Sequence, residues 1–151
     1  MLVSLKIDAV IKDIRTKSHL EVSSVADPAA RYKAEAGTEK LPELKRLLVE
    51  ANAEVYIGLR DYLVDDGDME ANNIVELGDY FVYQFIYSDR RFAGKAQALA
   101  DAIHAFLVDR VLSDFYISVS IPNLSQARKV QAEKDWSALM SLIRTKKIPR
   151  L

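Results

Sequence analysis

The stretch LPELKRLLVEANAEVYIGLRDYLV, residues 41–64, carries the clearest structural signal in the sequence. Its apolar residues recur at spacings of three or four positions, the spacing of one face of an α-helix. These residues are Leu44, Leu48, Ala51, Val55, Leu59 and Tyr62. Pro42 suits a first helical turn, and the run of acids and glycine at 65–68 ends the pattern. The stretch therefore predicts a long amphipathic helix with one buried stripe.

The same periodicity recurs on both sides of this helix. Four other segments are predicted helices: Ser4 to about Lys17, Pro28 to Ala36, Phe92 to Asp114, and Asn123 to Lys147. Ser4 and Asn123 are residue types that favour the N-cap position, and Gly37 is a natural stop after a helix. The sequence thus predicts four or five helices in all.

Residues 74–87 are typical of strands rather than helices. Ile74–Leu77 and Tyr80–Tyr87 are rich in β-branched and aromatic residues, and Gly78-Asp79 between them is a two-residue turn signal. We therefore predict a β-hairpin. The alternative is a helix across the same residues, which would make the protein all-α. Phe115–Ile121 also leans toward β structure and is closed by Pro122.

The predicted strand at 80–87 has two largely apolar faces. Strand alternation places Phe81, Tyr83, Phe85 and Tyr87 on one face, and Tyr80, Val82, Gln84 and Ile86 on the other. We expect the first face to cover the helices. The second face either joins the core or meets a partner, since aromatic residues are enriched in interfaces. Its four residues are our candidate interface.

Length and composition favour one mainly α-helical domain across residues 1–151, a compact bundle with a small β element and a short basic tail at 145–151. The chain has no cysteine, which excludes disulfides, thiolate metal sites and a cysteine nucleophile. The N-terminus does not resemble a signal peptide, and no apolar run is long enough for a membrane helix. We therefore expect a cytoplasmic protein without membrane contact.

Charge is distributed unevenly along a chain whose net charge is −1. Residues 61–79 hold seven acids and no base, whereas residues 123–151 hold seven bases and two acids. The basic residues Arg144, Lys146, Lys147 and Arg150 form a second candidate interface, with a protein or with nucleic acid. Nucleic acid is not favoured, because no basic stripe follows a whole helix.

No motif in the sequence indicates catalysis or a cofactor. The five glycines are too widely separated for a phosphate-binding loop, and the two histidines do not form a zinc motif. We expect His104 at the edge of the core with a satisfied hydrogen bond, and His19 in a connector. The Asp65–Glu70 loop fails the EF-hand pattern, so we interpret it as a solvated loop, with a weak divalent-metal site as the alternative. We expect no cofactor, no small-molecule ligand and no enzymatic activity.

The stretch AIHAFLVDRVLSDFY, residues 102–116, resembles small uncharacterised prophage-encoded proteins. The order of parts is also similar: an aromatic strand-like stretch, this helix, and a final helix ending in a basic tail. In size and helical content the chain looks more loosely like phage head–tail connector and tail-completion proteins. The resemblance implies an assembly subunit that is virion-associated after assembly and whose partners are copies of itself or neighbouring virion proteins. It supplies no catalytic residue.

Overall fold

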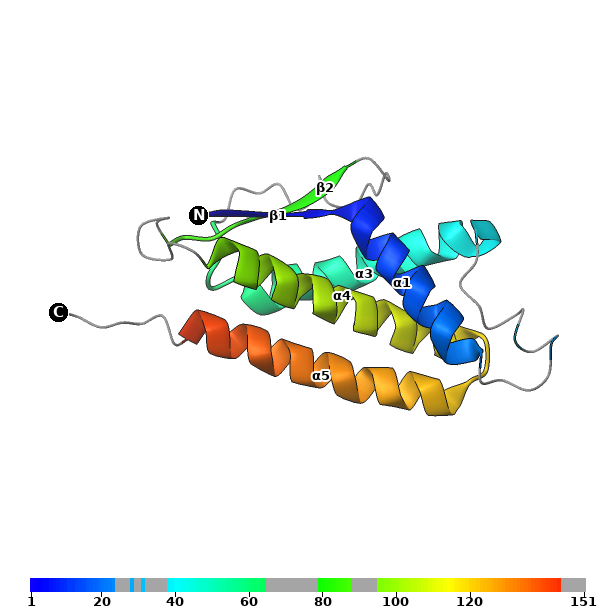
Figure 1. The fold of residues 1–151 in the computed structure, drawn as a ribbon. Coiled ribbons are helices and arrows are strands. Elements are labelled where there is room, and N and C mark those ends of the chain that lie inside the picture. The colour runs from blue at the N-terminus through cyan, green and yellow to red at the C-terminus, as the bar shows by residue number, and fades with distance from the viewer. Residues whose placement is uncertain (24–27, 29–30, 32–37, 65–78, 88–94, 145–151) are drawn as a thin grey trace.

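The computed structural model describes residues 1–23, 28, 31, 38–64, 79–87 and 95–144. The protein is mainly helical with a small antiparallel two-stranded sheet, which confirms the predicted fold class (Figure 1). In chain order the elements are β1 (Leu2–Lys6), α1 (Ile7–Val22), the 3₁₀ turn η1 (Thr38–Lys40), α3 (Leu41–Leu59), β2 (Tyr80–Gln84), α4 (Ala96–Ser118) and α5 (Pro122–Arg144).

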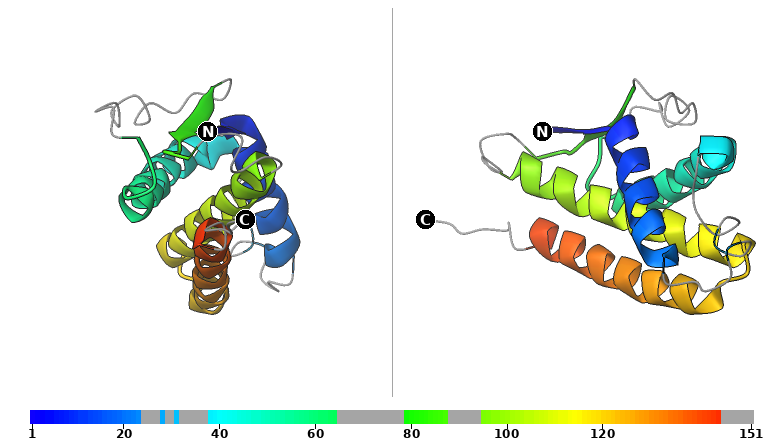
Figure 2. Two further views of the ribbon diagram at one scale, coloured as in Figure 1. Left: turned by 90° about the vertical axis from the view of Figure 1, so that its left-hand side faces the viewer. Right: turned by 45° about the vertical axis from the view of Figure 1, so that its right-hand side comes forward.

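Helix α4 is the centre of the fold. Figure 2 shows it end-on, with the sheet, α1, α5 and α3 arranged around it. A helix enclosed in this way needs apolar residues around its whole circumference. The sequence of α4 meets that need, because its buried residues include Leu99, Ile103, Leu107, Val111 and Phe115 as well as residues between these positions. Within the described ranges, no helix combines the length and apolar character needed to cross a membrane.

Helix α3 has the predicted stripe. Leu44, Leu48, Ala51, Val55 and Leu59 are all buried, and Tyr62 beyond them is half-buried. The helix ends at Leu59, earlier than the predicted Val64. It ends there because the chain turns into the sheet, where Leu63 forms an isolated antiparallel bridge with Phe85.

The predicted helix start at Ser4 is wrong. Residues Leu2–Lys6 form strand β1, and α1 begins at Ile7. Val3 and Leu5 are buried between exposed neighbours, the alternation of a strand. Val3 also fits the helical spacing to Ile7, which made the two interpretations hard to separate. The longer helix reaches Val22, so His19 lies in its last turn rather than in a connector.

Strand β2 confirms β structure over Tyr80–Gln84, but its described partner is β1. The pairs are Leu2 with Gln84, Val3 with Tyr83, Ser4 with Val82, Leu5 with Phe81, and Lys6 with Tyr80. Ile74–Leu77, the predicted first strand of the hairpin, lies outside the described residues. The observed sheet therefore joins two segments separated by the whole of α1 and α3.

The predicted β stretch at Phe115–Ile121 is also wrong. Helix α4 continues to Ser118, because Phe115 and Tyr116 point into the core at helical spacing from Leu112. The chain then reverses at Ser120, which has a left-handed φ of 62°. Helix α5 begins at Pro122, so Asn123 lies inside the first turn and is not its N-cap.

Two other predicted segments lie largely outside the described residues. Of the helix predicted at Pro28–Ala36, the structure describes Pro28 and Arg31, both in helical conformation. The helix predicted to end at Lys147 is described as far as Arg144. The Asp65–Glu70 loop and the basic tail at 145–151 are not described.

Candidate interaction surface

The outer face of the sheet exposes large apolar side chains. Strand β2 alternates between exposed and buried residues, as predicted. The relative exposures are 51% for Tyr80, 40% for Val82 and 56% for Ile86, and Leu2 of β1 beside them is 56% exposed. Val64, which adjoins β2 on its other side, is 42% exposed. We call these five residues, Leu2, Val64, Tyr80, Val82 and Ile86, the outer face.

The inner face of β2 is fixed to helix α3. Phe81, Tyr83 and Phe85 are each at most 1% exposed. The Tyr83 hydroxyl donates a hydrogen bond to the Asn52 side-chain carbonyl of α3, and the Tyr83 ring stacks on Tyr56 with centroids 5.2 Å apart. Burial raises the pKa of Tyr83 well above its ordinary value, so its hydroxyl stays protonated and remains a donor.

The edge of β2 that faces away from β1 is hydrogen-bonded to the chain that follows α3. The Val64 amide donates to the Gln84 carbonyl at 2.7 Å, and the Ile86 amide donates to the Tyr62 carbonyl at 2.9 Å. The Tyr56 hydroxyl donates to the carbonyl of Val82. These bonds hold β2 firmly, so the outer face is presented on a rigid support.

The structure brings together the first predicted interface set and places Arg144, the described residue of the second set, elsewhere. Tyr80, Val82, Gln84 and Ile86 all lie exposed on one face. Arg144 is exposed at the end of α5, which packs on the opposite side of α4 from the sheet (Figure 1). Lys146, Lys147 and Arg150 lie outside the described residues. Sequence reasoning missed Leu2 and Val64, because only the strand pairing places them beside β2.

A second feature is a charged cluster between α1, α4 and α5. The Arg128 guanidinium donates to both Glu21 carboxylate oxygens, at 3.0 and 3.1 Å from Nε, and also to Asp109. The Tyr116 hydroxyl donates to Glu21 at 2.9 Å. The Asp109 side chain is 3% exposed and that of Arg128 is 17% exposed. One arginine therefore links carboxylates from two other helices below the surface.

Asp109 has a strongly raised pKa, about 7, compared with an ordinary 3.8. Burial is the main cause, because it disfavours the charged carboxylate. Interaction with the Asp135 carboxyl raises the pKa further, and pairing with Arg128 opposes both effects. Sequence analysis did not find this cluster. The available signal in the sequence was that Arg128 lies at helical spacing from Ser125, Ala132 and Leu139, which are the buried residues of α5 around it.

His104 behaves as predicted, at the edge of the core. Its Nε2 lies 2.7 Å from Oδ2 of Asp13, and its side chain is 24% exposed. This pair connects α4 to α1. Among the described residues, no group of three or more histidine, aspartate and glutamate side chains is arranged to hold a metal ion. The Asp65–Glu70 loop is outside that set and stays an untested alternative.

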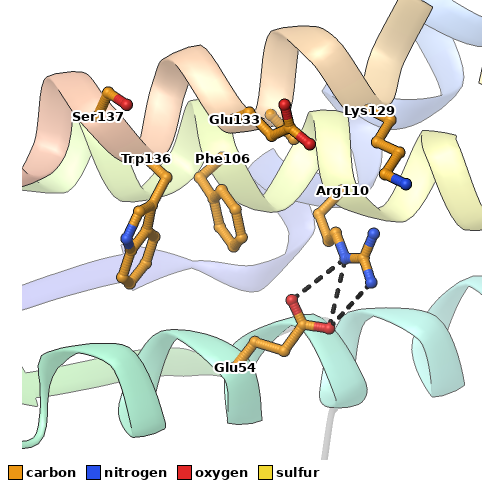
Figure 3. Close-up of a pocket in the computed structure, with 8 residues that line it drawn as sticks. Glu54, Phe106, Arg110, Lys129, Glu133, Trp136 and Ser137 are labelled. Atoms are coloured by element: carbon orange, nitrogen blue, oxygen red, sulfur yellow. Dashed lines mark hydrogen bonds and ion pairs between the residues drawn. The ribbon is translucent and has the colours of Figure 1, made fainter. Parts of the chain in front are cut away.

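A third feature is a cleft of about 450 Å³ between α3 and α5, with α4 as its floor. Figure 3 shows Phe106 and Trp136 pointing toward α3, with Lys129 and Glu133 along the α5 side. Arg110 and Glu54 bridge the cleft through an ion pair with N–O distances of 3.1 to 3.3 Å. The cleft combines two aromatic rings with both signs of charge. Its geometry does not select one ligand class.

Gly58 allows Trp136 to pack against α3. A Cβ atom at Gly58 would lie 2.4 Å from two atoms of the indole ring, well inside van der Waals contact. We expect Gly58→Ala to displace the ring and destabilise the fold by about 1–2 kcal/mol, since overpacking costs more than the helix propensity of alanine returns. Trp136 is the only tryptophan, so its fluorescence reports the displacement directly.

The control for this prediction is the same substitution beside a smaller ring. In a Trp136→Phe background, Gly58→Ala should be neutral or stabilising, because the clash is removed and the helix propensity remains. Equal effects of Gly58→Ala in both backgrounds would show that the indole does not occupy the space at Gly58. Urea denaturation of the four proteins provides the comparison.

Comparison of the chain with protein-family models, curated proteins and solved structures finds no match. The functional proposals therefore rest on the sequence and on the three features described above. Of these, the outer face has the clearest chemical character, because it exposes several apolar side chains to water on one side of the sheet.

Proposed function

We propose that this chain is a non-enzymatic structural protein that acts as a subunit of a phage-derived assembly, of the head–tail connector or tail-completion type. Its partners are copies of itself or neighbouring virion proteins. The outer face of the sheet is the observation that carries this proposal. The resemblance of residues 102–116 to prophage-encoded proteins supports the kind of assembly.

The outer face differs from the other exposed apolar residues because its members share one side of the sheet. Leu20, Ile57, Ile117 and Val130 are also exposed, but each lies on a different helix. Single exposed apolar residues are normal on soluble proteins. Five on one side of a small sheet and its adjoining residues are unusual, and large exposed apolar patches mark interaction sites. The strand register sets Leu2 opposite Gln84, Val82 opposite Ser4 and Tyr80 opposite Lys6, so this face combines apolar side chains with three polar ones.

The rigidity of the sheet also supports a docking role. Binding costs less conformational entropy when the surface is already fixed before the partner arrives. The Tyr83–Asn52 hydrogen bond and the Tyr56–Tyr83 stacking fix β2 from below. A partner on the outer face would therefore meet side chains whose backbone does not need to rearrange.

The nucleic-acid alternative depends on four basic residues, of which the structure describes Arg144 alone. The metal alternative depends on the Asp65–Glu70 loop, which lies outside the described residues. Neither alternative has a described feature comparable to the outer face. We therefore favour protein association.

Sedimentation velocity over a range of protein and salt concentrations tests the proposal. We expect concentration-dependent association that Val82→Lys weakens at least about 10-fold, because it places a charge at the centre of the outer face and 1.4 kcal/mol corresponds to that factor. Ile117→Lys is the matched control, since Ile117 is 65% exposed on α4. The control should associate like the parent protein.

A strict monomer at high concentration would contradict association between copies. Equal weakening by both lysine variants would show that the effect is one of charge rather than of the outer face. Circular dichroism of Val82→Lys should match the parent protein, because the Val82 side chain points away from the core.

A further inference from the structure

The backbone of β1 alternates between groups that bond to β2 and groups that point away from it. The Phe85 amide donates to the Met1 carbonyl at 2.8 Å, and the Ile7 amide donates to the Asp79 carbonyl at 3.1 Å. With the observed register, Val3 and Leu5 lie in the hydrogen-bonded pairs between these two points. Leu2 and Ser4 therefore direct their amides and carbonyls toward the other edge of β1, and Lys6 directs its amide there.

That other edge has no partner strand within the described part of the chain. The sheet has two strands in the order β1–β2, and the opposite edge is the one that residues 62–64 cover. Helix α1 leaves the sheet at Lys6 and runs toward α5 rather than along β1 (Figure 1). An unpaired strand edge is a ready template for another strand, and proteins that stay monomeric usually block it.

We propose that β1 pairs antiparallel with β1 of a second copy, with Ser4 on the two-fold axis. This rests on the proposed function and names the partner of the sheet as another copy of the chain. Ser4 would exchange both hydrogen bonds with the partner's Ser4. The amide of Lys6 would donate to the carbonyl of Leu2 across the axis. The carbonyl of Lys6 would not take part in this pairing, because the residue before a helix uses its carbonyl in the first helical bond.

The sequence of β1 fits this register better than any neighbouring one. Only a two-fold axis at Ser4 pairs all three outward-directed residues, Leu2, Ser4 and Lys6, in a five-residue strand. A shift by two residues would leave part of the edge unpaired. In the Ser4 register each Lys6 lies opposite Leu2, so no like charges face each other directly. Homodimers usually have such a two-fold axis, with the same surface of each subunit in the interface.

The pairing would also double the outer face. Leu2, Ser4 and Lys6 point their side chains to the same side of the sheet as Tyr80 and Val82. Joining two β1 strands would create a four-stranded sheet, β2–β1–β1–β2, with one continuous exposed surface. A larger apolar patch on such a sheet is a better docking site for a further virion protein than either half alone.

Cysteine cross-linking tests the register directly, because the chain contains no cysteine. In Ser4→Cys the two sulfurs would face each other across the axis, with Cα atoms about 5.5 Å apart, which permits a disulfide. We expect mild oxidation to produce mainly covalent dimer. Lys6→Cys is the matched control: in this register the Cα atoms of the two introduced cysteines would be separated by roughly four residues of strand, about 13 Å, which is too far.

Each outcome decides between the pairing and the broader proposal. Dimer from Ser4→Cys without dimer from Lys6→Cys supports the pairing. Equal cross-linking of the two variants, or none from Ser4→Cys, overturns it. If association persists without Ser4 cross-linking and is still weakened by Val82→Lys, the pairing is wrong while the outer face remains the docking surface. If the parent protein does not associate at all, self-association through the sheet is excluded.

Ser4→Pro offers an independent check that uses no cysteine. Proline lacks an amide hydrogen, and the Ser4 amide points away from β2, so the β1–β2 ladder stays intact. We expect this variant to fold with an unchanged circular-dichroism spectrum and to lose concentration-dependent association. Association at the level of the parent protein would contradict the pairing.

Discussion

Arg128→Met is expected to destabilise the protein by about 3–5 kcal/mol, the cost of leaving a buried charge without its partner. Within the part of the chain that the structure describes, Arg128 is the cation bonded to Asp109, and it also neutralises Glu21. Methionine fills a similar volume, so the loss arises from charge rather than from a cavity. Guanidinium denaturation at about pH 8, where Asp109 of the parent protein is ionised, gives the free energy of unfolding.

Arg46→Met is the control for that experiment. Arg46 pairs with Glu50 within α3, but both side chains are more than half exposed. An exposed pair of this kind contributes less than about 1 kcal/mol. The double variant Asp109→Asn with Arg128→Met should recover part of the loss, because it removes the unpaired carboxylate. A cost below about 1 kcal/mol for Arg128→Met would show that water reaches the cluster.

The helical part of the fold could be predicted because the signal for a helix is local. The stripe of α3 appears within one stretch of sequence, and the structure buries Leu44, Leu48 and Val55 as that stripe requires. Alternation along β2 is local in the same sense. It correctly separated Tyr83, which is buried, from Val82, which is exposed.

The sheet topology could not be predicted, because it depends on contacts distant in sequence. Ser4 pairs with Val82 across the whole of α1 and α3. Nothing near Ser4 distinguishes the start of a helix from a strand that precedes one. The error at Phe115 has a related cause: aromatic residues favour strands on average, but packing around a central helix overrides that tendency.

The candidate sites divide in the same way. Tyr80, Val82 and Ile86 were predicted to share one face, since they belong to one stretch of sequence, whereas Leu2 and Val64 joined the outer face only through strand pairing. The cluster around Arg128 unites residues from three helices, so no single segment of the sequence indicated it. Its pKa effects arise from burial, which is a property of the folded chain.

The stability of the protein is expected to fall as the pH rises from about 4 to 7 because of Asp109. In the folded state the pKa of Asp109 is about 7, compared with an ordinary 3.8. Between these values the folded carboxyl holds a proton that the unfolded chain has released. Raising the pH therefore favours unfolding, until the pH passes about 7 and Asp109 is ionised in both states. Allowing for partial screening, the change amounts to about 2–4 kcal/mol.

The pH effect of Asp109 is isolated by comparing the parent protein with Asp109→Asn, because carboxylates that do not interact with Asp109 contribute equally to the pH dependence of both proteins. The amide cannot ionise, so Asp109→Asn should gain about 2–4 kcal/mol relative to the parent protein between about pH 4 and pH 8. Asp101→Asn, an exposed position on the same helix, should run parallel to the parent protein. A constant difference between Asp109→Asn and the parent protein across this range would mean that the Asp109 carboxyl is ionised in the fold throughout. The effect of Arg128, which lowers the pKa of Asp109, would then be larger than the effect of burial, which raises it. The 3% exposure of the Asp109 side chain leads us to expect the opposite.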